Sequence, residues 1–426
     1  MPAELSLREV LHNHLREQDL PFRDFVRLAL YHPELGYYTR PENPVGRHGD
    51  YITAPTLSPA FAFAIGRLVR EFVSRAEGEV CSIVDIGCGD GSLIRAVAAA
   101  FRPPARFLGS SVPRFLGDGE VEGTGGAGGM EAPPESPRGT PRNPEEPRNP
   151  GTEELRDRGT EGLRFFGIDQ SLHRANPQPD DTVEFATSLD AVPTGGAHLL
   201  FTNELFDAFP FARLVRRGSS LHELWVTKSG DTLDWSEREA PQEYARYFDE
   251  RGVALDDGQF ADISLDWSRS YEDLARRVEH GLIVTCDYGF QQSKLFHPRA
   301  RRYGTAAAYT GQRVTRDLLA QPGEQDLTAH INFTDLERAG ERRGARTLFF
   351  DSLARFLLGL GITEHEHYRP IEEFGISTVQ EGVEAIEARE NARRLVLPDG
   401  IGHDLRVLVQ VRGFEGDGWS FQRPLF

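Results

Sequence analysis

Residues 83–92 read IVDIGCGDGS, in which three glycines alternate directly after an apolar run. The segment CSIVDIG is short and rich in β-branched residues and predicts a buried parallel strand, and SLIRAVAAAF predicts the helix that follows it. A strand, a glycine turn and a helix in this order can bind a ligand, because amides at the helix N-terminus face it. A purely structural turn is the alternative interpretation.

The glycine spacing and two acids indicate which ligand such a turn would accept. Gly87, Gly89 and Gly91 have the spacing GxGxG, whereas the dinucleotide fingerprint is GxGxxG. Asp85 ends the strand and Asp90 lies within the turn, so two carboxylates would repel a pyrophosphate. They suit a ligand with an amino group and a ribose but no phosphate. The pattern therefore favours S-adenosylmethionine and disfavours a dinucleotide oxidoreductase.

A third acid, Asp169, ends the predicted strand LRFFGID and would sit at the carboxyl edge of the neighbouring strand. There it could accept hydrogen bonds from both ribose hydroxyls, although the offset from the glycine turn far exceeds the usual ~20 residues. Residues 110–161 are dominated by Gly, Pro, Glu and Arg and are predicted to be a disordered insertion. Excising them restores nearly the expected spacing. A helix cap or turn residue is the alternative for Asp169.

The remaining chain alternates predicted strands with helices, which indicates an α/β fold with a doubly wound, Rossmann-like sheet. FARLVRR, LHELWVTKSG and DTLDWSERE predict an antiparallel hairpin system, and 297–333 is predicted to be irregular. The predicted layout has five parts: an N-terminal helical and loop region lining the substrate side (1–76), the first part of the core (77–109 and 162–212), the insertion (110–161), an inserted antiparallel β and helical substrate-side element (213–278), and the rest of the core with the PGEQDLTAH loop (279–426).

The charge and composition of the chain indicate which kinds of binding partner and cofactor to expect. The 426-residue chain carries a net charge of −18, which disfavours broad nucleic-acid binding and favours a cationic partner such as an arginine-bearing protein segment. Plain solubility is the simpler reading of that charge. No apolar run approaches the ~20 residues of a membrane helix, and no signal peptide is recognised, so we expect no membrane insertion. Cys81, Cys88 and Cys286 lack a zinc-ligand spacing, so no metal is expected.

The stretch FTNELFDAFP follows another apolar strand and carries candidate catalytic residues. Asn203 and Glu204 would emerge at the ligand edge of the sheet, and Asp207 continues the loop. Methyl transfer is an in-line displacement that depends on alignment, and a carboxylate can steer a guanidinium and accept its proton. The alternative is that Asn203 and Glu204 merely cap the next helix.

Six segments in this order resemble the MidA-like family of S-adenosylmethionine-dependent methyltransferases: GDYITAPTLSPAF, VDIGCGDGSL, NELFDAFP, VTCDYGF, GTAAAYTGQRV and LAQPGEQDLTAHINF. Mitochondrial members of that family are assembly factors for respiratory complex I and act as protein arginine methyltransferases. The resemblance implies a class I methyltransferase core with added N-terminal helices and an inserted substrate-side element.

The resemblance also implies roles for individual residues. The cofactor-binding set is Asp85, Gly87, Gly89, Gly91, Asp169 and Asn203. The catalytic set is Asn203, Glu204, Asp207, Glu324, Asp326 and His330. Asp287, Tyr288 and Gly289 match the family's DYG, and Pro322, Gly323 and Thr328 match the PG-acid-x-DLTAH segment. The chain departs from the family at Thr56, where an acid is usual, and in beginning the glycine motif with Asp85-Ile86 rather than Glu-Leu.

The acids of the DLTAH segment have a physical rationale. Glu324 and Asp326, near Tyr303 and Tyr309 in the sequence, could bind a guanidinium through bidentate contacts and stacking. Alternatively, Asp326 and His330 fasten the loop by hydrogen bonds.

The sequence therefore predicts an S-adenosylmethionine-dependent methyltransferase acting on a protein arginine, with a complex I-type subunit as one candidate partner. Methylation of a small molecule or of another protein nucleophile remains open, as does a non-catalytic assembly factor that binds the cofactor. The expected location is the cytoplasm, or the mitochondrial matrix if the source is eukaryotic.

Overall fold

The computed structural model describes residues 6–39, 53–101, 162–171, 182–374, 378–414 and 417–424. The predicted disordered insertion, 110–161, lies outside them. The chain divides into two compact units, one of Met1–Ala100 with Gly162–Phe426 and one of Phe101–Glu161. All that follows concerns the first unit. In its described part, no helix combines the length and apolar character needed to cross a lipid bilayer.

A mixed eight-stranded sheet forms the core, and its main path runs β15-β16-β10-β5-β2-β3-β4, with β14 extending β10. The strands are β2 (Cys81–Ile86), β3 (Leu163–Ile168), β4 (Val183–Ala186), β5 (Ala197–Asn203), β10 (Gly281–Phe290), β14 (Ile331–Asn332), β15 (Arg346–Ser352) and β16 (Leu405–Arg412). From β4 to β10 neighbouring strands are parallel, whereas β16 is antiparallel to both of its neighbours. All six residues of β2 are buried, as its apolar run predicted.

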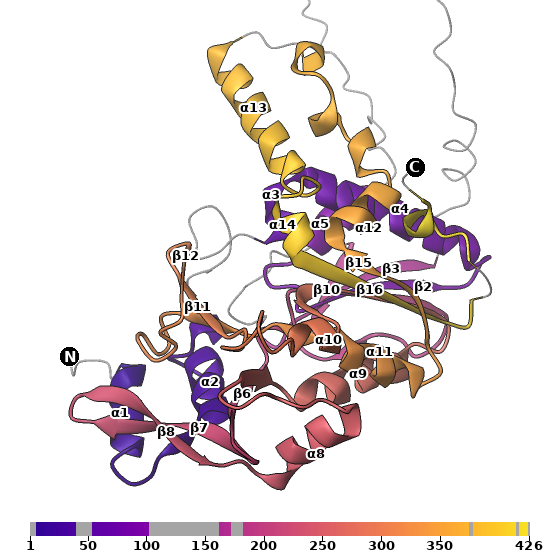
Figure 1. Cartoon of the computed structure of the whole chain (residues 1–426). Coiled ribbons are helices and arrows are strands. Elements are labelled where there is room, and N and C mark those ends of the chain that lie inside the picture. Colours follow the sequence, from indigo (N-terminus) through magenta and orange to yellow (C-terminus); the bar gives the residue numbers. More distant parts are fainter. Residues whose placement is uncertain are drawn as a thin grey trace, which may run out of the picture. The chain divides into compact units, whose positions relative to one another are not determined.

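Helices cover both faces of this sheet (Figure 1). The helices α4 (Pro59–Arg75), α5 (Ser92–Ala99), α12 (Leu353–Gly359) and α14 (Ile401–Asp404) lie on one face, and α9 (Asp266–Arg277) and α11 (Phe333–Glu341) lie on the other. Helix α4 begins where Pro59 predicted, because Ser58 Oγ accepts the Ala60 N–H and proline suits the first helical turn. The predicted α/β, doubly wound fold is confirmed.

The second sheet runs β1-β7-β6-β9, with β8 paired to β7. Its strands are β1 (Leu20–Pro21), β6 (Ala212–Arg217), β7 (Ser220–Ser229), β8 (Thr232–Glu239) and β9 (Phe260–Ile263), and α8 (Gln242–Arg251) lies between β8 and β9 in the chain. The antiparallel pairs β6–β7 and β7–β8 are those predicted from the alternating sequence.

The N-terminal segment packs against this second sheet. Helix α1 (Leu7–His14) starts at a capping box between Ser6 and Glu9, and α2 (Phe22–Tyr31) follows directly after β1. Strand β1 pairs with β7, and the Phe22 ring lies 4.8 Å from the ring of Trp235. Residues from opposite ends of the predicted layout therefore share one apolar core.

The expectation that 297–333 is irregular is wrong. This stretch holds β11 (Ala307–Thr310), β12 (Arg313–Thr315) and β13 (Asp326–Thr328), which form a three-stranded antiparallel sheet in the order β12-β11-β13. Each strand has only three or four residues, too few to show a clear alternating pattern. The other short or peripheral helices are α3 (Ala54–Leu57), α10 (Gln292–Leu295) and α13 (Val379–Arg393).

Candidate active site at the carboxyl edge of the sheet

The loops after four parallel strands meet at one edge of the central sheet. Ile86 on β2 pairs with Ile168 on β3 and with Thr202 on β5, and Cys286 on β10 pairs with Asn203. Because the strands end in register, the residues that follow them lie side by side, as in other open α/β sheets that bind ligands at this edge.

The glycine turn adopts the left-handed backbone that its sequence requires. Gly87, Gly89 and Gly91 have φ values of 74°, 55° and 74°. A Cβ on Gly87 would lie 2.8 Å from the Leu205 side chain, and one on Gly91 would lie 2.4 Å from the Phe185 ring. A Cβ on Gly89 would meet nothing within 4 Å. Two of the glycines therefore allow tight packing, and Gly89 faces open space that a bound cofactor could occupy.

Asp169 closes the turn from the neighbouring strand. Its Oδ2 accepts a 3.0 Å hydrogen bond from the Gly89 N–H, and its Oδ1 accepts bonds of 2.8 and 2.6 Å from the N–H and hydroxyl of Ser171. The contact with Ser171 is the turn-forming role that was the alternative interpretation. A carboxylate can accept about four hydrogen bonds, so capacity remains for a further donor. A ribose-binding role for Asp169 stays a prediction.

The two other acids of the turn differ in environment. Asp85 is buried, and burial together with the nearby carboxylates of Asp169 and Asp90 raises its pKa to about 7. Asp90 is exposed, and its Oδ1 accepts a 2.9 Å bond from the Ser92 N–H at the start of α5. A cationic amino group near Asp85 would favour its ionised form.

Next to the turn, Glu204, Asp207, Asp287 and Asp326 form a group that we call the acidic cluster. Burial raises the pKa of Glu204 to about 8, and the charges of Asp287 and Asp326 act in the same direction. Burial and the three other carboxylates likewise hold the pKa of Asp207 well above its usual range. A cation bound among these carboxyl groups would favour the ionised forms of Glu204 and Asp207.

Glu204 is held by its neighbour Asn203 and by the N-terminal region. Its Oε1 accepts a 3.0 Å bond from Asn203 Nδ2 and a 3.3 Å bond from the Ala54 N–H. Glu204 has φ = 50°, a conformation uncommon for a residue with a side chain. The backbone after β5 therefore turns sharply at this carboxylate, and Asn203 orients the side chain rather than capping a long helix.

Asp287 organises the loop that carries Glu204 and Asp207. It is fully buried and accepts bonds of 2.8 Å from the Phe206 N–H, 3.2 Å from the Leu205 N–H and 2.8 Å from the Tyr288 N–H. Burial nevertheless raises its pKa to about 7. The family resemblance identifies Asp287 as part of the DYG motif but predicts no role for it. Its position in the second half of a buried strand, β10, was the available signal.

Tyrosines of the N-terminal segment and of β11 border the acidic cluster. Tyr38 Oη donates a 2.9 Å hydrogen bond to Asp326 Oδ1, and the Tyr31 ring stacks on that of Tyr38 at 5.6 Å. Tyr309 lies directly opposite Asp326 in the β11–β13 pairing. Sequence reasoning singled out Tyr309 and overlooked Tyr31 and Tyr38, whose only signal was the aromatic-rich stretch YHPELGYYTR.

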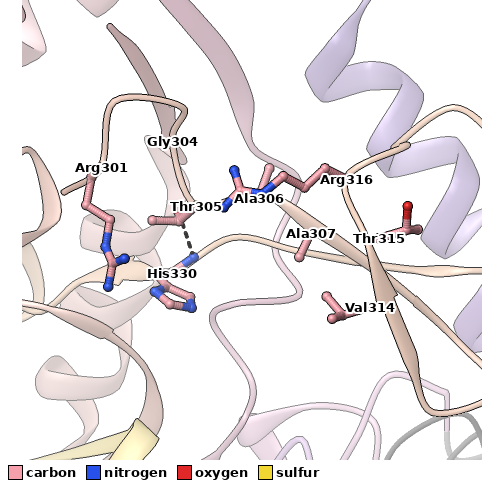
Figure 2. Close-up of a pocket in the computed structure, with 9 residues that line it drawn as sticks. All are labelled: Arg301, Gly304, Thr305, Ala306, Ala307, Val314, Thr315, Arg316 and His330. Carbon is pink, nitrogen blue, oxygen red and sulfur yellow. Dashed lines mark hydrogen bonds between the residues drawn. The ribbon is translucent and has the colours of Figure 1, made fainter. Parts of the chain in front are cut away.

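The other predicted site residues are placed differently. Glu324 is exposed in the turn before β13, where its N–H donates to the Gln321 carbonyl. His330 lies in a separate pocket beside Arg301 and Thr305 (Figure 2), and its ring stacks on that of Tyr288 at 6.2 Å. Burial and the Arg301 charge lower the pKa of His330 to about 4, so its imidazole is neutral. Tyr303 is also exposed.

Thr56, the departure from the family pattern, lies in α3 next to this site. Its hydroxyl donates a 2.9 Å bond to the Thr53 carbonyl, and the Ala54 N–H between them contacts Glu204. An acid at position 56 would stand on the short helix that already contacts the acidic cluster.

Comparison with known proteins agrees with this geometry. The family model described as "Putative S-adenosyl-L-methionine-dependent methyltransferase" matches residues 163–350. The protein arginine methyltransferase NDUFAF7 homolog of Drosophila melanogaster, a mitochondrial protein, is 25% identical over 76% of this chain and 67% of its own length. The mitochondrial protein arginine methyltransferase NDUFAF7 of Mus musculus is 22% identical over 81% of this chain and 72% of its own length.

A solved structure extends the comparison to the fold. A crystal structure of a "likely methyl transferase" from Burkholderia thailandensis, bound to S-adenosyl-homocysteine, superposes with a TM-score of 0.72, 21% identity and coverage of 98% of this chain and 94% of that one. The sheet and the match show the class I, Rossmann-like methyltransferase fold. In sequence, the chain is similar to S-adenosylmethionine-dependent methyltransferases over residues 163–350 and to protein arginine methyltransferases over most of its length, as the six motifs predicted. This similarity supports S-adenosylmethionine as the cofactor.

Proposed function

We propose that this protein transfers a methyl group from S-adenosylmethionine to a guanidinium nitrogen of a protein arginine. The observation that carries the proposal is the acidic cluster, which lies at the same strand edge as the open glycine turn. Carboxylates bordered by tyrosines suit a planar cation, because guanidinium groups pair with carboxylates and stack on aromatic rings.

The cofactor would supply an electrophilic methyl group, and the residues of the turn would hold it. Gly89 leaves room for close approach, Asp85 can attract the amino group, and Asp169 has capacity for a ribose hydroxyl. Asn203 connects the two halves of the site, because its amide contacts Glu204 at the end of β5.

The acidic cluster would perform the acceptor side of the reaction. A bound guanidinium favours the ionised forms of Glu204 and Asp207, whose pKa values are raised in the free protein. The ionised carboxylates orient one nitrogen toward the methyl group and offer an acceptor for the proton that this nitrogen loses. Asp326, held by Tyr38, adds a further negative charge.

The names of the relatives support a protein acceptor, since the fly and mouse proteins are both named protein arginine methyltransferases. Their mitochondrial designation supports a mitochondrial location if the source is eukaryotic. The matrix in that case, and the cytoplasm otherwise, remain predictions from the sequence. A complex I-type subunit as the partner rests on the family resemblance alone.

Two measurements test the proposal. Calorimetry with S-adenosylmethionine tests the cofactor site, and methyl transfer from labelled cofactor to protein extracts, read by mass spectrometry, tests the acceptor. We expect E204Q to retain cofactor binding and to lose methyl transfer, and E239Q, which removes an exposed acid on β8, to retain both.

The outcomes separate the alternatives. Methylated metabolites without methylated arginine would favour a small-molecule methyltransferase, and methylation of another side chain would indicate a different protein nucleophile. Cofactor binding with no transfer to any acceptor would favour a non-catalytic assembly factor. Absence of cofactor binding in the intact protein would overturn the proposal.

A further inference from the structure

A pocket of about 370 Å³ is lined by residues of β11 and β12 and differs in charge from the acidic cluster. Arg301, Arg316 and His330 line it together with Thr305 and Val314, and no carboxylate is among its described lining residues (Figure 2). We call it the basic pocket. Its presence is notable because the chain as a whole carries a net charge of −18.

The arginines of this pocket are not paired with acids among the described residues. The buried Asp262 accepts hydrogen bonds from the Thr305 and Ala306 N–H groups of the pocket wall, but its ion pair is with Arg213. Eighteen ion pairs are found among the described residues, and nearly all of them join an arginine to an acid. Neither Arg301 nor Arg316 takes part in any of them. Arg301 instead lies over the Phe290 ring, 4.7 Å from its centroid, which fixes its position. His330 Nδ1 is buried and has no hydrogen-bond partner among the described residues.

One face of the small β11–β12–β13 sheet joins the basic pocket to the acidic cluster. Tyr309 lies opposite Asp326 on one side and opposite Val314 on the other, so these three side chains share a face. Ala307, two residues before Tyr309, is on that same face and lines the pocket with Val314. The stacked rings of Tyr288 and His330 form a second connection between the two sites.

We propose that the basic pocket binds a carboxylate of the protein substrate, close in sequence to the arginine that the acidic cluster receives. The inference rests on the proposed function and adds a sequence preference to it. A guanidinium binds a carboxylate through paired hydrogen bonds, and Arg301 is already held in position by Phe290. Ala307 and Tyr309 are separated by about 7 Å along the strand, so an acid one to three residues from the arginine would reach the pocket in an extended peptide.

The test uses the full-length protein and three matched peptides that contain one arginine. One peptide carries aspartate two residues from the arginine, one carries asparagine there, and one carries phosphoserine. Binding is measured by fluorescence anisotropy, with inorganic phosphate as a competitor. We expect the aspartate peptide to bind wild type about tenfold more tightly than the asparagine peptide, as one charge-assisted pair allows.

Variants locate the effect. The double variant R301Q/R316Q should bind the aspartate and asparagine peptides equally, and R301K should keep only part of the difference because lysine lacks the planar fork. R16Q, which removes an exposed arginine after α1, should preserve the full difference. Thermal unfolding and calorimetry with S-adenosyl-homocysteine show whether R301Q/R316Q remains folded and binds cofactor.

The inference is overturned if wild type binds the aspartate and asparagine peptides equally, if an aspartate preference survives in R301Q/R316Q, or if no peptide binds. Equal binding together with competition by phosphate would indicate a free-anion site. Preference for phosphoserine alone would also reject a carboxylate. The proposed function fails by a different measurement, namely loss of cofactor binding in wild type, so the two failures are distinguishable.

Discussion

The Gly89 N–H donates a 3.0 Å hydrogen bond to Asp169 Oδ2, which joins residues 80 positions apart in the chain. The bond fixes the open glycine of the turn against the end of the neighbouring strand. Asp169 is thereby part of the wall that a cofactor would contact, and not only a candidate partner for its ribose.

Replacing Asp169 should weaken cofactor binding. D169A removes the acceptor for Gly89 and Ser171 as well as the remaining hydrogen-bonding capacity of the carboxylate, so we expect affinity for S-adenosyl-homocysteine to fall about tenfold to a hundredfold. Calorimetry measures this directly. D169N, which keeps one acceptor oxygen, should lie between D169A and wild type, and unchanged affinity in D169A would contradict a cofactor role.

The two glycines at 89 and 91 should respond differently to alanine. A Cβ on Gly91 meets the Phe185 ring at 2.4 Å and the backbone is left-handed, so G91A should lower the free energy of unfolding by about 1–3 kcal/mol. G89A carries the backbone strain without the clash, so it should destabilise the fold less and weaken cofactor binding more. Urea unfolding measures the stability of both variants, and calorimetry measures their affinity for S-adenosyl-homocysteine. An equal loss of stability in G89A and G91A would contradict the finding that a Cβ on Gly89 meets no neighbouring atom.

Binding of an arginine-containing substrate should strengthen as pH rises. Glu204 has a pKa of about 8 in the free protein, so at neutral pH it is largely protonated and attracts a guanidinium weakly. Substrate affinity should therefore increase between pH 6.5 and about 8.5 and level off above that. The same titration on E204Q should be flatter, and an identical pH profile in both proteins would remove Glu204 from the acceptor site.

The same carboxyl group should make stability depend on pH in the opposite direction. Its pKa is about 8 in the folded chain against 4.5 as the ordinary value, so the folded state binds more protons between these limits. Stability from this group is fully present below about pH 4.5 and is lost as pH rises through 8. E204Q has no such titration. Compared with wild type, E204Q should therefore be more stable at pH 8 than it is at pH 5, as measured by urea unfolding at both pH values.

Tyr38 should contribute to binding of the methyl acceptor and not to binding of the cofactor. Y38F removes the donor to Asp326, a loss of about 1 kcal/mol, and we expect a severalfold rise in KM for the methyl acceptor with unchanged S-adenosyl-homocysteine affinity. Y303F, which alters an exposed tyrosine, serves as the control. A change in cofactor affinity alone would instead place Tyr38 on the other half of the site.

Much of the fold could be predicted from local pattern. Buried runs such as Cys81–Ile86 and the proline at 59 marked strands and a helix start, because burial and backbone geometry act over a few residues. The small sheet of β11, β12 and β13 was missed because its strands are too short for a period to appear. Its pairing depends on partners that only the folded chain brings together.

The candidate site divides in the same way. Acids at or just after the carboxyl ends of apolar strands, such as Asp85 and Glu204, could be located from sequence because parallel strands end at a common edge. The separation of His330 from the acidic cluster could not be predicted, since His330 follows the end of β13 and the chain there leads its side chain into a different pocket. Glu324, exposed in its turn, illustrates the same difficulty.

The sequence by itself determined the α/β class, the glycine turn and the acids that flank it, because these follow from side-chain period and from the backbone freedom of glycine. Only the tertiary structure decided that Tyr38 reaches Asp326, that Asp287 holds the Glu204 loop, and that Arg301 and His330 form a basic pocket. These contacts join segments far apart in the chain, and their existence depends on packing that no local pattern encodes.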